Sequence, residues 1–273
     1  MSRVILLGTG TPNLDPDRYG PSVAITVNRS AYIIDFGPGV VRRATSAGIL
    51  PSQMTCAFLT HLHSDHTTGY PDLIFSPAVV GRTEPLEVFG PTGLTRMTDH
   101  VMAAYSEDLR ERKQWSALSN ERGYIVNPHE ICEGIIYHDD DTTVEAFRVD
   151  HGSLEAYGFK FLAEDGAIVI SGDTRPSPAL ITKARGCSIL IHEVYTAEGL
   201  KDRPKEWQKY HSRVHTSTFE LSEIANLVKP DLLVLYHQLH WKRTDDELLS
   251  EVTEGYSGRV ISGKDLDVFE LAT

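Results

Sequence analysis

The segment Thr60-His61-Leu62-His63-Ser64-Asp65-His66 is the most informative part of this sequence. It places three histidines and one aspartate within seven residues, directly after an apolar run from Cys56 to Leu59 that predicts a buried strand. The polar cluster therefore falls where a strand ends, which is the usual position of a site in an α/β sheet. Imidazole and carboxylate groups are the ligands that zinc and related metals prefer. A compact loop would point the first two histidines one way and the aspartate and last histidine another, which favours two adjacent metal ions over one.

Further candidate ligands follow apolar segments later in the chain. They are His151 after the segment 144–149, Asp173 after 167–170, and His237 after 232–235. Taken singly, each histidine could be a core or capping residue and the aspartate could be a turn residue. Because all three occupy the same position relative to a predicted strand, we expect them to converge with the first cluster at one edge of a sheet.

Composition and charge are those of an ordinary globular protein. The chain has 273 residues, of which 41% are hydrophobic, and it contains no linker or low-complexity tract, so a single domain over residues 1–273 is expected. Its net charge of −12 argues against a general nucleic-acid binder, which needs a basic surface. An anionic substrate is still compatible with this charge, because two divalent metals would dominate the local field.

A cytoplasmic location without membrane contact is expected. No segment approaches the roughly 18 apolar residues that can span a bilayer, and residues 1–7 lack the charged and apolar regions of a signal peptide. The cysteines at positions 56, 132 and 187 are widely spaced and odd in number, so no disulfide framework is expected. Cys56 and Cys187 fall in apolar runs and are expected to be buried thiols.

Strands predominate in the first part of the predicted chain and then alternate with helices. Strands are expected at 4–7, 22–27, 31–36, 86–89, 144–149, 157–162, 167–170, 188–191 and 232–235, and helices at 40–47, 178–184, 216–228 and 245–254. The less regular predictions are a short helix broken by two prolines at 67–80, one amphipathic helix at 94–113, an irregular loop at 196–215, and a final hairpin or strand pair at 260–271. Residues 8–12 are interpreted as a tight turn at the rim of the site, and His129, His138 and 139–141 as surface groups.

The pattern His61-X-His63-X-Asp65-His66, followed by Gly69, resembles the signature of the metallo-β-lactamase superfamily. Within it, the sequence looks most like the RNase Z and arylsulfatase-like branch. This resemblance implies an α/β (α+β) fold, a four-layer αββα sandwich built from two related halves, over essentially the whole chain. It also implies that Asp35 lies behind the metals, whereas the sequence itself is equally compatible with a helix cap at that position.

The resemblance further implies a site for two metal ions. His61, His63 and His151 would hold the first metal, Asp65, His66 and His237 the second, and Asp173 would bridge them. Diiron relatives have a glutamate in the first half of the cluster. The nitrogen donor of His63 therefore favours zinc over iron, with manganese as an alternative. Two ions about 3.5–4 Å apart would share a water, lower its pKa towards about 7, and polarise an oxygen of the substrate.

Two later motifs are candidates for proton transfer. His192-Glu193-Val194-Tyr195 and His215-Thr216-Ser217 resemble the RNase Z motifs His-Glu-Ala-Thr and His-Ser-Thr, although the residues after the glutamate and after the histidine differ. In this interpretation His215 is the general acid, and Glu193 orients it and favours its charged form. Asp65, Glu193 and His215 are the predicted catalytic residues. A surface carboxylate and a helix-terminal histidine are the alternatives without chemistry.

The substrate is left open between several anionic esters. RNase Z carries a long arm after a Tyr-Gly pair, whereas here Tyr157-Gly158 is followed by a short hairpin, which weakens the case for transfer RNA. The basic loop 201–213, with Trp207 and Tyr210, could form a pocket wall or be a merely solvated loop, and His240 and Trp241 beyond it could line the same pocket. A zinc-dependent hydrolase of phosphodiesters is predicted. The alternatives are transfer-RNA processing, aryl sulfate, lactone or β-lactam hydrolysis, and a non-catalytic scaffold. A homodimer is compatible with the resemblance.

Overall fold

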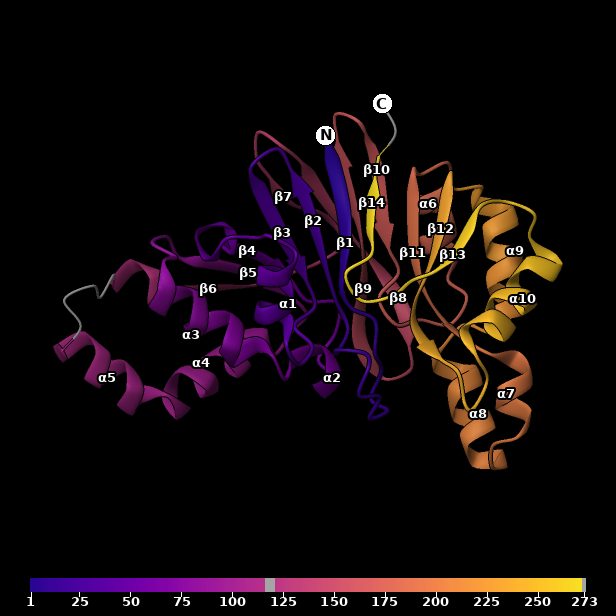
Figure 1. Cartoon of the computed structure of the whole chain (residues 1–273), viewed down its shortest axis with the longest axis horizontal. Helices are drawn as coiled ribbons and strands as arrows, with labels where there is room; N and C mark the ends of the chain where they lie inside the picture. Colours follow the sequence, from indigo (N-terminus) through magenta and orange to yellow (C-terminus); the bar gives the residue numbers. More distant parts are fainter. Residues whose placement is uncertain (116–120, 272–273) are drawn as a thin grey trace.

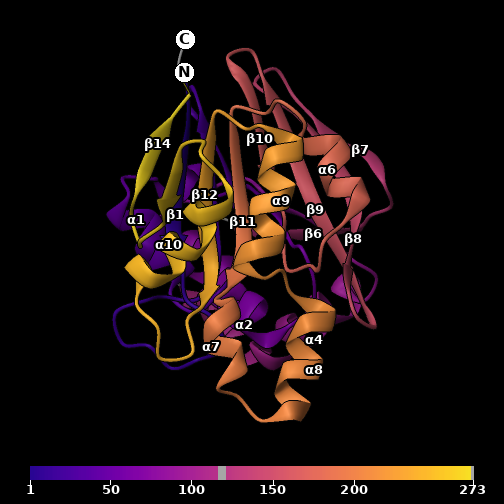
Figure 2. The same ribbon diagram turned by 90° about the vertical axis from the view of Figure 1, so that its right-hand side faces the viewer.

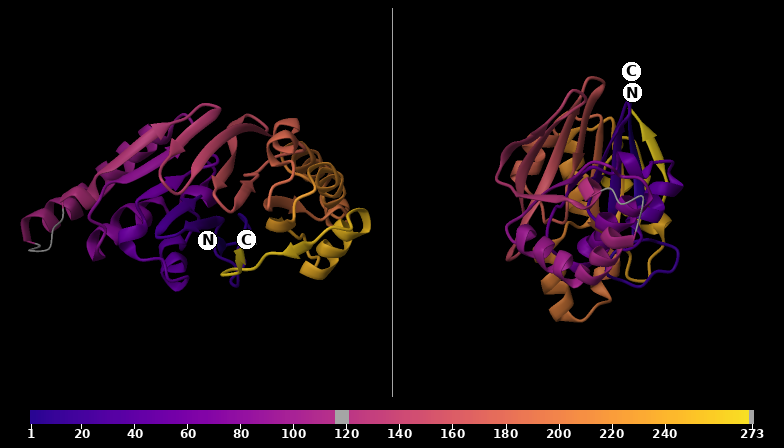
Figure 3. Two further views of the ribbon diagram at one scale, coloured as in Figure 1. Left: turned by 90° about the horizontal axis from the view of Figure 1, so that it is seen from above. Right: turned by 90° about the vertical axis from the view of Figure 1, so that its left-hand side faces the viewer.

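Two β-sheets packed face to face, with helices on both outer sides, make up the structure (Figure 1). The computed structural model describes residues 1–115 and 121–271. From above, the indigo-to-magenta first half and the orange-to-yellow second half lie on opposite sides (Figure 3). The predicted four-layer αββα arrangement is therefore confirmed.

The first sheet has the strand order β14-β1-β2-β3-β4-β5-β6 among the described residues. Its strands are β1 (Ser2–Gly8), β2 (Ser22–Val27), β3 (Ser30–Ile34), β4 (Cys56–Phe58), β5 (Leu86–Gly90), β6 (Val126–Glu130) and β14 (Val268–Glu270). The accompanying helices are α1 (Val40–Ser46), α2 (Ser64–Thr67), α3 (Tyr70–Val80), α4 (Leu94–Ala104) and α5 (Ser106–Trp115), with short 3-10 turns at Pro51–Gln53 and Glu121–Tyr124. Strands β3 to β6 run parallel to one another.

The second sheet has the strand order β13-β12-β11-β10-β9-β8-β7. Its strands are β7 (Gly134–His138), β8 (Thr143–His151), β9 (Leu154–Ala163), β10 (Gly166–Ile170), β11 (Ile189–Tyr195), β12 (Leu232–Leu239) and β13 (Val260–Ser262). The helices of this half are α6 (Pro178–Ala184), α7 (Ala197–Lys201), α8 (Lys205–Val214), α9 (Thr218–Val228) and α10 (Asp245–Gly255). Strands β10 to β13 are again parallel.

Alternation along the strands explains why three cores form. In β1, Val4 and Leu6 face the space between the sheets, whereas Ile5 and Leu7 face the helices of the first half. A third core joins the outer face of the second sheet to α6, α9 and α10. Since both faces of the central strands are buried, these strands appear in the sequence as continuous apolar runs.

The parallel strands bring the chemically interesting residues to one end of the sandwich. The carboxyl ends of parallel strands meet at the same edge of a sheet, and the helices that follow them there, α2 and α8, lie at the lower end in both Figure 1 and Figure 2. None of the helices in residues 1–115 and 121–271 has the length and apolarity that crossing a bilayer requires. Cys56 and Cys187 are buried free thiols, as predicted, and Cys132 is exposed.

Two predictions about helices in the first half were wrong. The single helix expected at 94–113 is two helices, α4 and α5, interrupted at Tyr105, whose ring packs on Phe75 with 4.7 Å between centroids. In the segment 67–80, Pro71 lies in the first turn of α3 rather than breaking it, because its fixed φ suits that turn and its missing N–H would be unpaired there anyway. Pro77 is accommodated inside the same helix.

Two further predictions failed in the second half. The expected loop at 196–215 contains the helices α7 and α8, because polar and charged residues between its apolar positions hide the helical spacing. The expected C-terminal hairpin does not form either. Strand β13 pairs with β12 in the second sheet and β14 pairs with β1 in the first, so this segment returns the chain to the sheet in which it began.

Arg82 completes the hydrogen bonding around the proline inside α3. Pro77 has no N–H, so the carbonyl of Leu73, four residues earlier, lacks its helical donor. The buried guanidinium of Arg82 donates to that carbonyl (Nη1 to O, 2.9 Å), to the carbonyl of Ile74 (Nη2 to O, 2.7 Å), and to two backbone carbonyls of neighbouring segments. Burial lowers the pKa of Arg82 to about 10, so the side chain stays charged at neutral pH.

We expect Arg82→Ala to lower the free energy of unfolding by about 3 kcal/mol, because several buried carbonyls lose a charged donor. Urea denaturation followed by circular dichroism measures this change. Arg122→Ala is the matched control, since Arg122 is exposed and pairs with the exposed Glu84. Its expected effect is within about 0.5 kcal/mol. Equal and small effects of the two substitutions would contradict the structural role of Arg82.

Candidate metal centre

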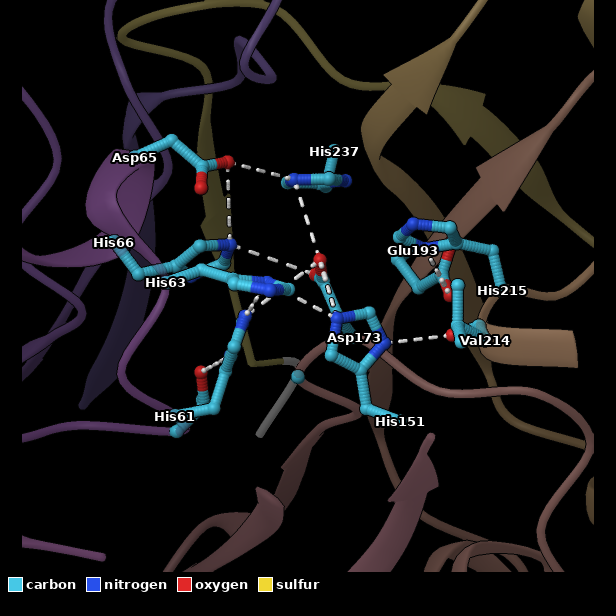
Figure 4. A network of polar contacts seen from close by, with 12 residues as sticks. His61, His63, Asp65, His66, His151, Asp173, Glu193, Val214, His215 and His237 are labelled. Carbon is cyan, nitrogen blue, oxygen red and sulfur yellow. Dashed lines mark hydrogen bonds and ion pairs between the residues drawn. The ribbon is translucent and has the colours of Figure 1, made fainter. Parts of the chain in front are cut away.

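Seven side chains from both halves of the chain point toward one another in a single cluster (Figure 4). Two groups of potential ligand atoms each fit within 4.8 Å, the first being His61, His63, His151 and Asp173 and the second Asp65, His66 and His237. In the first group, Nδ1 of His63 lies 3.0 Å from Nε2 of His61 and 3.1 Å from Nε2 of His151. In the second, Nε2 of His237 lies 3.3 Å from Oδ2 of Asp65. The structure thus brings together all seven residues that the sequence singled out as metal ligands.

Asp173 lies between the two groups. Its Oδ2 atom is 3.9 Å from Nε2 of His61 and 3.5 Å from Nε2 of His237, and its Oδ1 atom is 3.6 Å from Nε2 of His66. Burial alone would raise the pKa of Asp173, but the neighbouring His237 and His66 hold it well below its usual range. An ionised carboxylate is therefore positioned to contact both groups at once.

A bulge in β12 directs His237 into the site. The register of β11 and β12 pairs Glu193 with Tyr236 and Val194 with Gln238, so His237 is the extra residue between them. Its φ of 43° lies in the left-handed region that non-glycine residues rarely adopt. The strand therefore accepts a locally unfavourable backbone in order to aim this imidazole at Asp65 and Asp173.

Hydrogen bonds on the far side of the histidines fix their rings. Nδ1 of His66 lies 2.8 Å from Oδ2 of Asp35, Nδ1 of His61 lies 2.9 Å from the hydroxyl of Thr60, and Nδ1 of His151 donates to the carbonyl of Val214 at 2.7 Å. In each case the partner of Nδ1 leaves the Nε2 atom facing the centre. Such outer partners are typical of histidines that bind metal.

Asp35 supports the site rather than a helix. The backbone N–H of Thr60 donates to Oδ1 of Asp35 at 2.8 Å, and the Thr60 hydroxyl lies 3.0 Å from both carboxylate oxygens. Asp35 is buried and has a φ of 60°. The alternative that it caps the following helix is wrong, because α1 begins after Gly39 and no side chain caps it.

The donor set fits a bound cation. Nε2 of His66 and Oδ1 of Asp173 are buried, have no hydrogen-bond partner among the described residues, and lie 3.6 Å apart, as two atoms that face a common ion would. Burial lowers the pKa of His61 well below its ordinary value and also lowers those of His63 and His151. These imidazoles are therefore neutral at pH 7, which is the form that binds metal.

Glu193 and His215 form a buried pair beside the cluster. Oε1 of Glu193 accepts from the backbone N–H groups of Thr174 (3.0 Å) and Thr216 (3.2 Å) and lies 3.1 Å from Nδ1 of His215. Burial, reinforced by Asp173, raises the pKa of Glu193, and burial lowers the pKa of His215 to about 4. Glu193 is thus no surface carboxylate. These pKa directions run against the expectation that Glu193 keeps His215 charged in the free site.

A cavity of about 550 Å³ opens onto these groups. Its lining residues are Pro12, His63, Ser64, Asp65, Asp173, Glu206, Trp207, Tyr210, His211, His215, His237 and Leu239. From the basic segment 201–213, the aromatic side chains and Glu206 line the cavity, and the lysines and arginines do not. Pro12 is at the rim, as expected for the turn at 8–12, whereas His240 and Trp241 line a neighbouring cavity instead.

The sequence correctly predicted that two histidines lie outside this centre, but it did not identify one histidine that lines the cavity. His129 pairs with Glu87 on the surface and His138 contacts Thr143, so neither belongs to the site. Asp139 is more than a solvated turn, because it accepts hydrogen bonds from two tyrosine hydroxyls between the sheets. The sequence interpretation missed His211, although its position four residues before His215 would place both on one face of a helix.

Comparisons with known proteins agree with this geometry. The family model described as Anti-Pycsar protein Apyc1 matches residues 2–248. A protein named Ribonuclease Z from Mycobacterium sp. (strain KMS) is 31% identical over 246 residues, covering 88% of this chain and 85% of the relative. Another Ribonuclease Z, from Mycobacterium marinum, is 29% identical and covers 99% of both chains.

Solved structures match over nearly the full length as well. The metallo-β-lactamase fold protein YhfI from Bacillus subtilis superposes with a TM-score of 0.75 at 16% identity and covers 98% of both chains. The short form of human tRNase Z gives a TM-score of 0.76 at 20% identity and covers 99% of this chain and 100% of the other. The chain therefore belongs to the family described as Anti-Pycsar protein Apyc1, within the RNase Z-like branch of the metal-dependent hydrolases of the metallo-β-lactamase fold.

Proposed function

We propose that this chain binds two metal ions and hydrolyses small phosphodiesters or closely related anionic esters. The observation that carries the proposal is the placement of Asp173, whose carboxylate lies within 4 Å of histidines in both groups. A single ion would not need ligand atoms in two groups around a shared carboxylate. The all-nitrogen and carboxylate donor set, with His63 in the first group, favours zinc, and manganese is the alternative.

In this proposal the bound metals supply a Lewis acid and lower the pKa of a water molecule, so that it can attack at neutral pH. The side chains of the protein would hold the metals and accept the proton. His61, His63 and His151 present neutral nitrogens on one side, and Asp65, His66 and His237 complete the other side. Asp65 also lines the cavity, so its carboxylate is positioned to take up the proton that the attacking water releases.

His215 is assigned the role of proton donor to the leaving group. It lines the cavity, and its Nδ1 atom faces Glu193, so Nε2 is the nitrogen that can reach a leaving oxygen. Burial keeps His215 neutral in the free site, but an anionic ester in the cavity would favour its protonated form. Glu193, held by Thr174 and Thr216, fixes the orientation of the ring.

The dimensions of the cavity favour a small substrate. About 550 Å³ is within the range of pockets for single small molecules, roughly 300–1,000 Å³. The segment after Tyr157-Gly158 is the direct β9–β10 hairpin, turning at Glu164 and Asp165, so the clamp that the resemblance associates with transfer RNA is not built there. Cleavage of precursor transfer RNA is the second candidate, because the relatives found are named Ribonuclease Z.

The test uses the metal-loaded full chain against bis-p-nitrophenyl phosphate, p-nitrophenyl sulfate and a precursor transfer RNA, each with and without a chelator. We expect chelator-sensitive release of p-nitrophenolate from the phosphodiester, with much slower turnover of the sulfate. Cleavage of only the transfer RNA, at its 3′ side, would replace the proposal by the second candidate. No turnover of any ester after loading with zinc would favour a metal-binding scaffold.

We expect Asp35→Asn to weaken metal binding by about 10- to 100-fold without unfolding the chain. The amide can still accept from Thr60, but an N–H facing His66 cannot accept its Nδ1 proton. The imidazole is then driven to the tautomer that carries hydrogen on Nε2, the atom facing the centre. Competition with a chromophoric chelator measures the affinity. Unchanged affinity in the variant would mean that Asp35 does not set the tautomer of His66.

A further inference from the structure

A second cavity lies next to the one that contains the candidate centre. Its volume of about 310 Å³ is at the lower end of the range for small-molecule pockets. Three segments line it: the loop after β1, the connection between α7 and α8, and the end of β12 with the turn that follows. Among the described residues, none lines both cavities. The two are neighbours, because Trp241 of the second packs edge-on against His211 of the first, with 4.7 Å between ring centroids.

Positive charge predominates in the lining of this second cavity. Arg18, Arg203 and Lys242 line it, against the single carboxylate of Asp15. The nearby carboxylates both pair with one of these three cations. Nη2 of Arg18 donates to both oxygens of Asp245 at 2.8 Å, and Nε of Arg18 lies 3.9 Å from Oδ2 of Asp15. In a chain whose net charge is −12, the remaining cations make this cavity a local exception.

Arg203 and Lys242 have no carboxylate partner among the described residues. The Nε atom of Arg203 is buried without a hydrogen-bond partner there, and the guanidinium lies over the ring of Trp207, 5.5 Å from its centre. The backbone of Arg203 is held in place, because its N–H donates to the carbonyl of Leu200 at 3.0 Å and its carbonyl accepts from Nε2 of Gln208 at 2.7 Å. A buried donor without an acceptor costs free energy, and an oxyanion is the acceptor that a guanidinium binds most strongly.

A strained turn holds Lys242 at the cavity. The backbone N–H of Arg243 donates to the carbonyl of His240 at 3.0 Å, and the two residues between them, Trp241 and Lys242, have φ values of 43° and 71°. Turns with two such residues usually carry asparagine, aspartate or glycine there, because other side chains are disfavoured. Backbone strain of this kind concentrates at binding sites, and here it places both side chains in the cavity wall.

We propose that the second cavity binds the phosphate group of a small anionic molecule. This site is separate from the candidate metal centre, and it does not depend on the proposed hydrolysis. The planar guanidinium of Arg203 can donate to two oxygens of a phosphate, and the ammonium group of Lys242 supplies a second cation from another segment. Arg18, whose charge Asp245 balances, shapes the wall between them. Free phosphate and a phosphorylated organic molecule share this chemistry, so both serve as probes.

Calorimetric titration of the full chain, freed of metal by a chelator and then dialysed, tests this proposal. Without metal ions, the candidate centre lacks the cations that would hold phosphate there. We expect saturable binding of inorganic phosphate at physiological ionic strength. In Arg203→Gln with Lys242→Gln, the affinity should fall at least about 10-fold, because both charged donors are lost. Tighter binding of glycerol 3-phosphate than of phosphate would support a site for an organic phosphate, and equal affinity would support a site for the free ion.

Lys205→Gln with Lys209→Gln is the matched control, because it removes the same charge from nearby positions that line neither cavity. It should bind phosphate as the wild type does. An equal loss in the two double variants would overturn the proposal in favour of general charge attraction, and so would the absence of binding to the metal-free wild type. Lys242→Gln alone changes an exposed side chain, so it keeps the comparison if Arg203 is needed for folding. Its affinity should fall about 3-fold or more. Since the titration uses metal-free protein, its outcome is independent of whether the loaded chain hydrolyses esters.

Discussion

Asp173→Ala is expected to release both metal ions and to reduce ester hydrolysis by at least about 100-fold, more than the loss of an outer partner would cause. The carboxylate of Asp173 lies within 4 Å of histidines in both groups, with Oδ2 near His61 and His237 and Oδ1 near His66. Without it, each group keeps three predicted ligands, and both groups lose the carboxylate that lies near them.

The electrostatics make this loss severe. Asp173 is buried and ionised next to His237, whose pKa its charge raises against the effect of burial, and next to His66, whose pKa is raised by Asp35 and then by Asp173. Removing that carboxylate leaves several imidazoles around a cation with less negative charge to balance it, at a largely buried position. Metal affinity should therefore fall in both groups together rather than in one of them.

Elemental analysis after gel filtration measures the metal content of the variant. Asp150→Ala is the matched control, because Asp150 precedes His151, is partly exposed, and pairs with Arg175 outside the cluster. It should retain its metals. Circular dichroism of both variants would verify that the fold is preserved. Full metal content in Asp173→Ala would contradict its position between the two sites, and loss of about half of the metal would assign it to one site alone.

The ligands in the segment 60–66 could be predicted from the sequence because they are close neighbours along the chain. The cluster 60–66 has its spacing fixed by one loop, and the distant ligands follow apolar segments, so strands that run in the same direction bring them to the same edge. The bulge that turns His237 inward could not be predicted, because it depends on the register between β11 and β12. The roles of the ligands remain predictions.

The other incorrect predictions concern elements whose structure depends on contacts with residues far away in the sequence. Strands β13 and β14 have the strand-like composition expected of a hairpin, but each pairs with a strand that formed elsewhere in the chain. Helix α8 has few aliphatic residues, and its buried side consists of His211 and Val214, which hydrophobic spacing alone does not reveal. The donor that satisfies the carbonyl opposite Pro77 comes from Arg82, beyond the end of the helix. Each of these features is set by tertiary contacts rather than by local preference.

His215→Ala is expected to leave the metal content unchanged and to slow esters with poor leaving groups far more than esters with good ones. A leaving phenolate of low pKa departs without a proton, whereas one of high pKa needs a proton in the transition state. His215 is the cavity-lining histidine whose Nδ1 is held by Glu193, so its loss should remove that proton. For methyl phenyl phosphate we expect a decrease in kcat of about 100-fold or more, and for methyl p-nitrophenyl phosphate a decrease of about 10-fold or less.

The readout is the slope of log kcat against the pKa of the leaving phenol, which should become steeper in the variant. Glu193→Gln tests orientation separately, because the amide can still accept from Thr174 and Thr216 but no longer provides a carboxylate beside the ring. It should steepen the slope less than His215→Ala. Equal slowing of all esters would argue against proton donation. Since His215 also lies within 4.8 Å of potential ligand atoms of Asp173 and His237, a loss of metal would reassign it as a ligand.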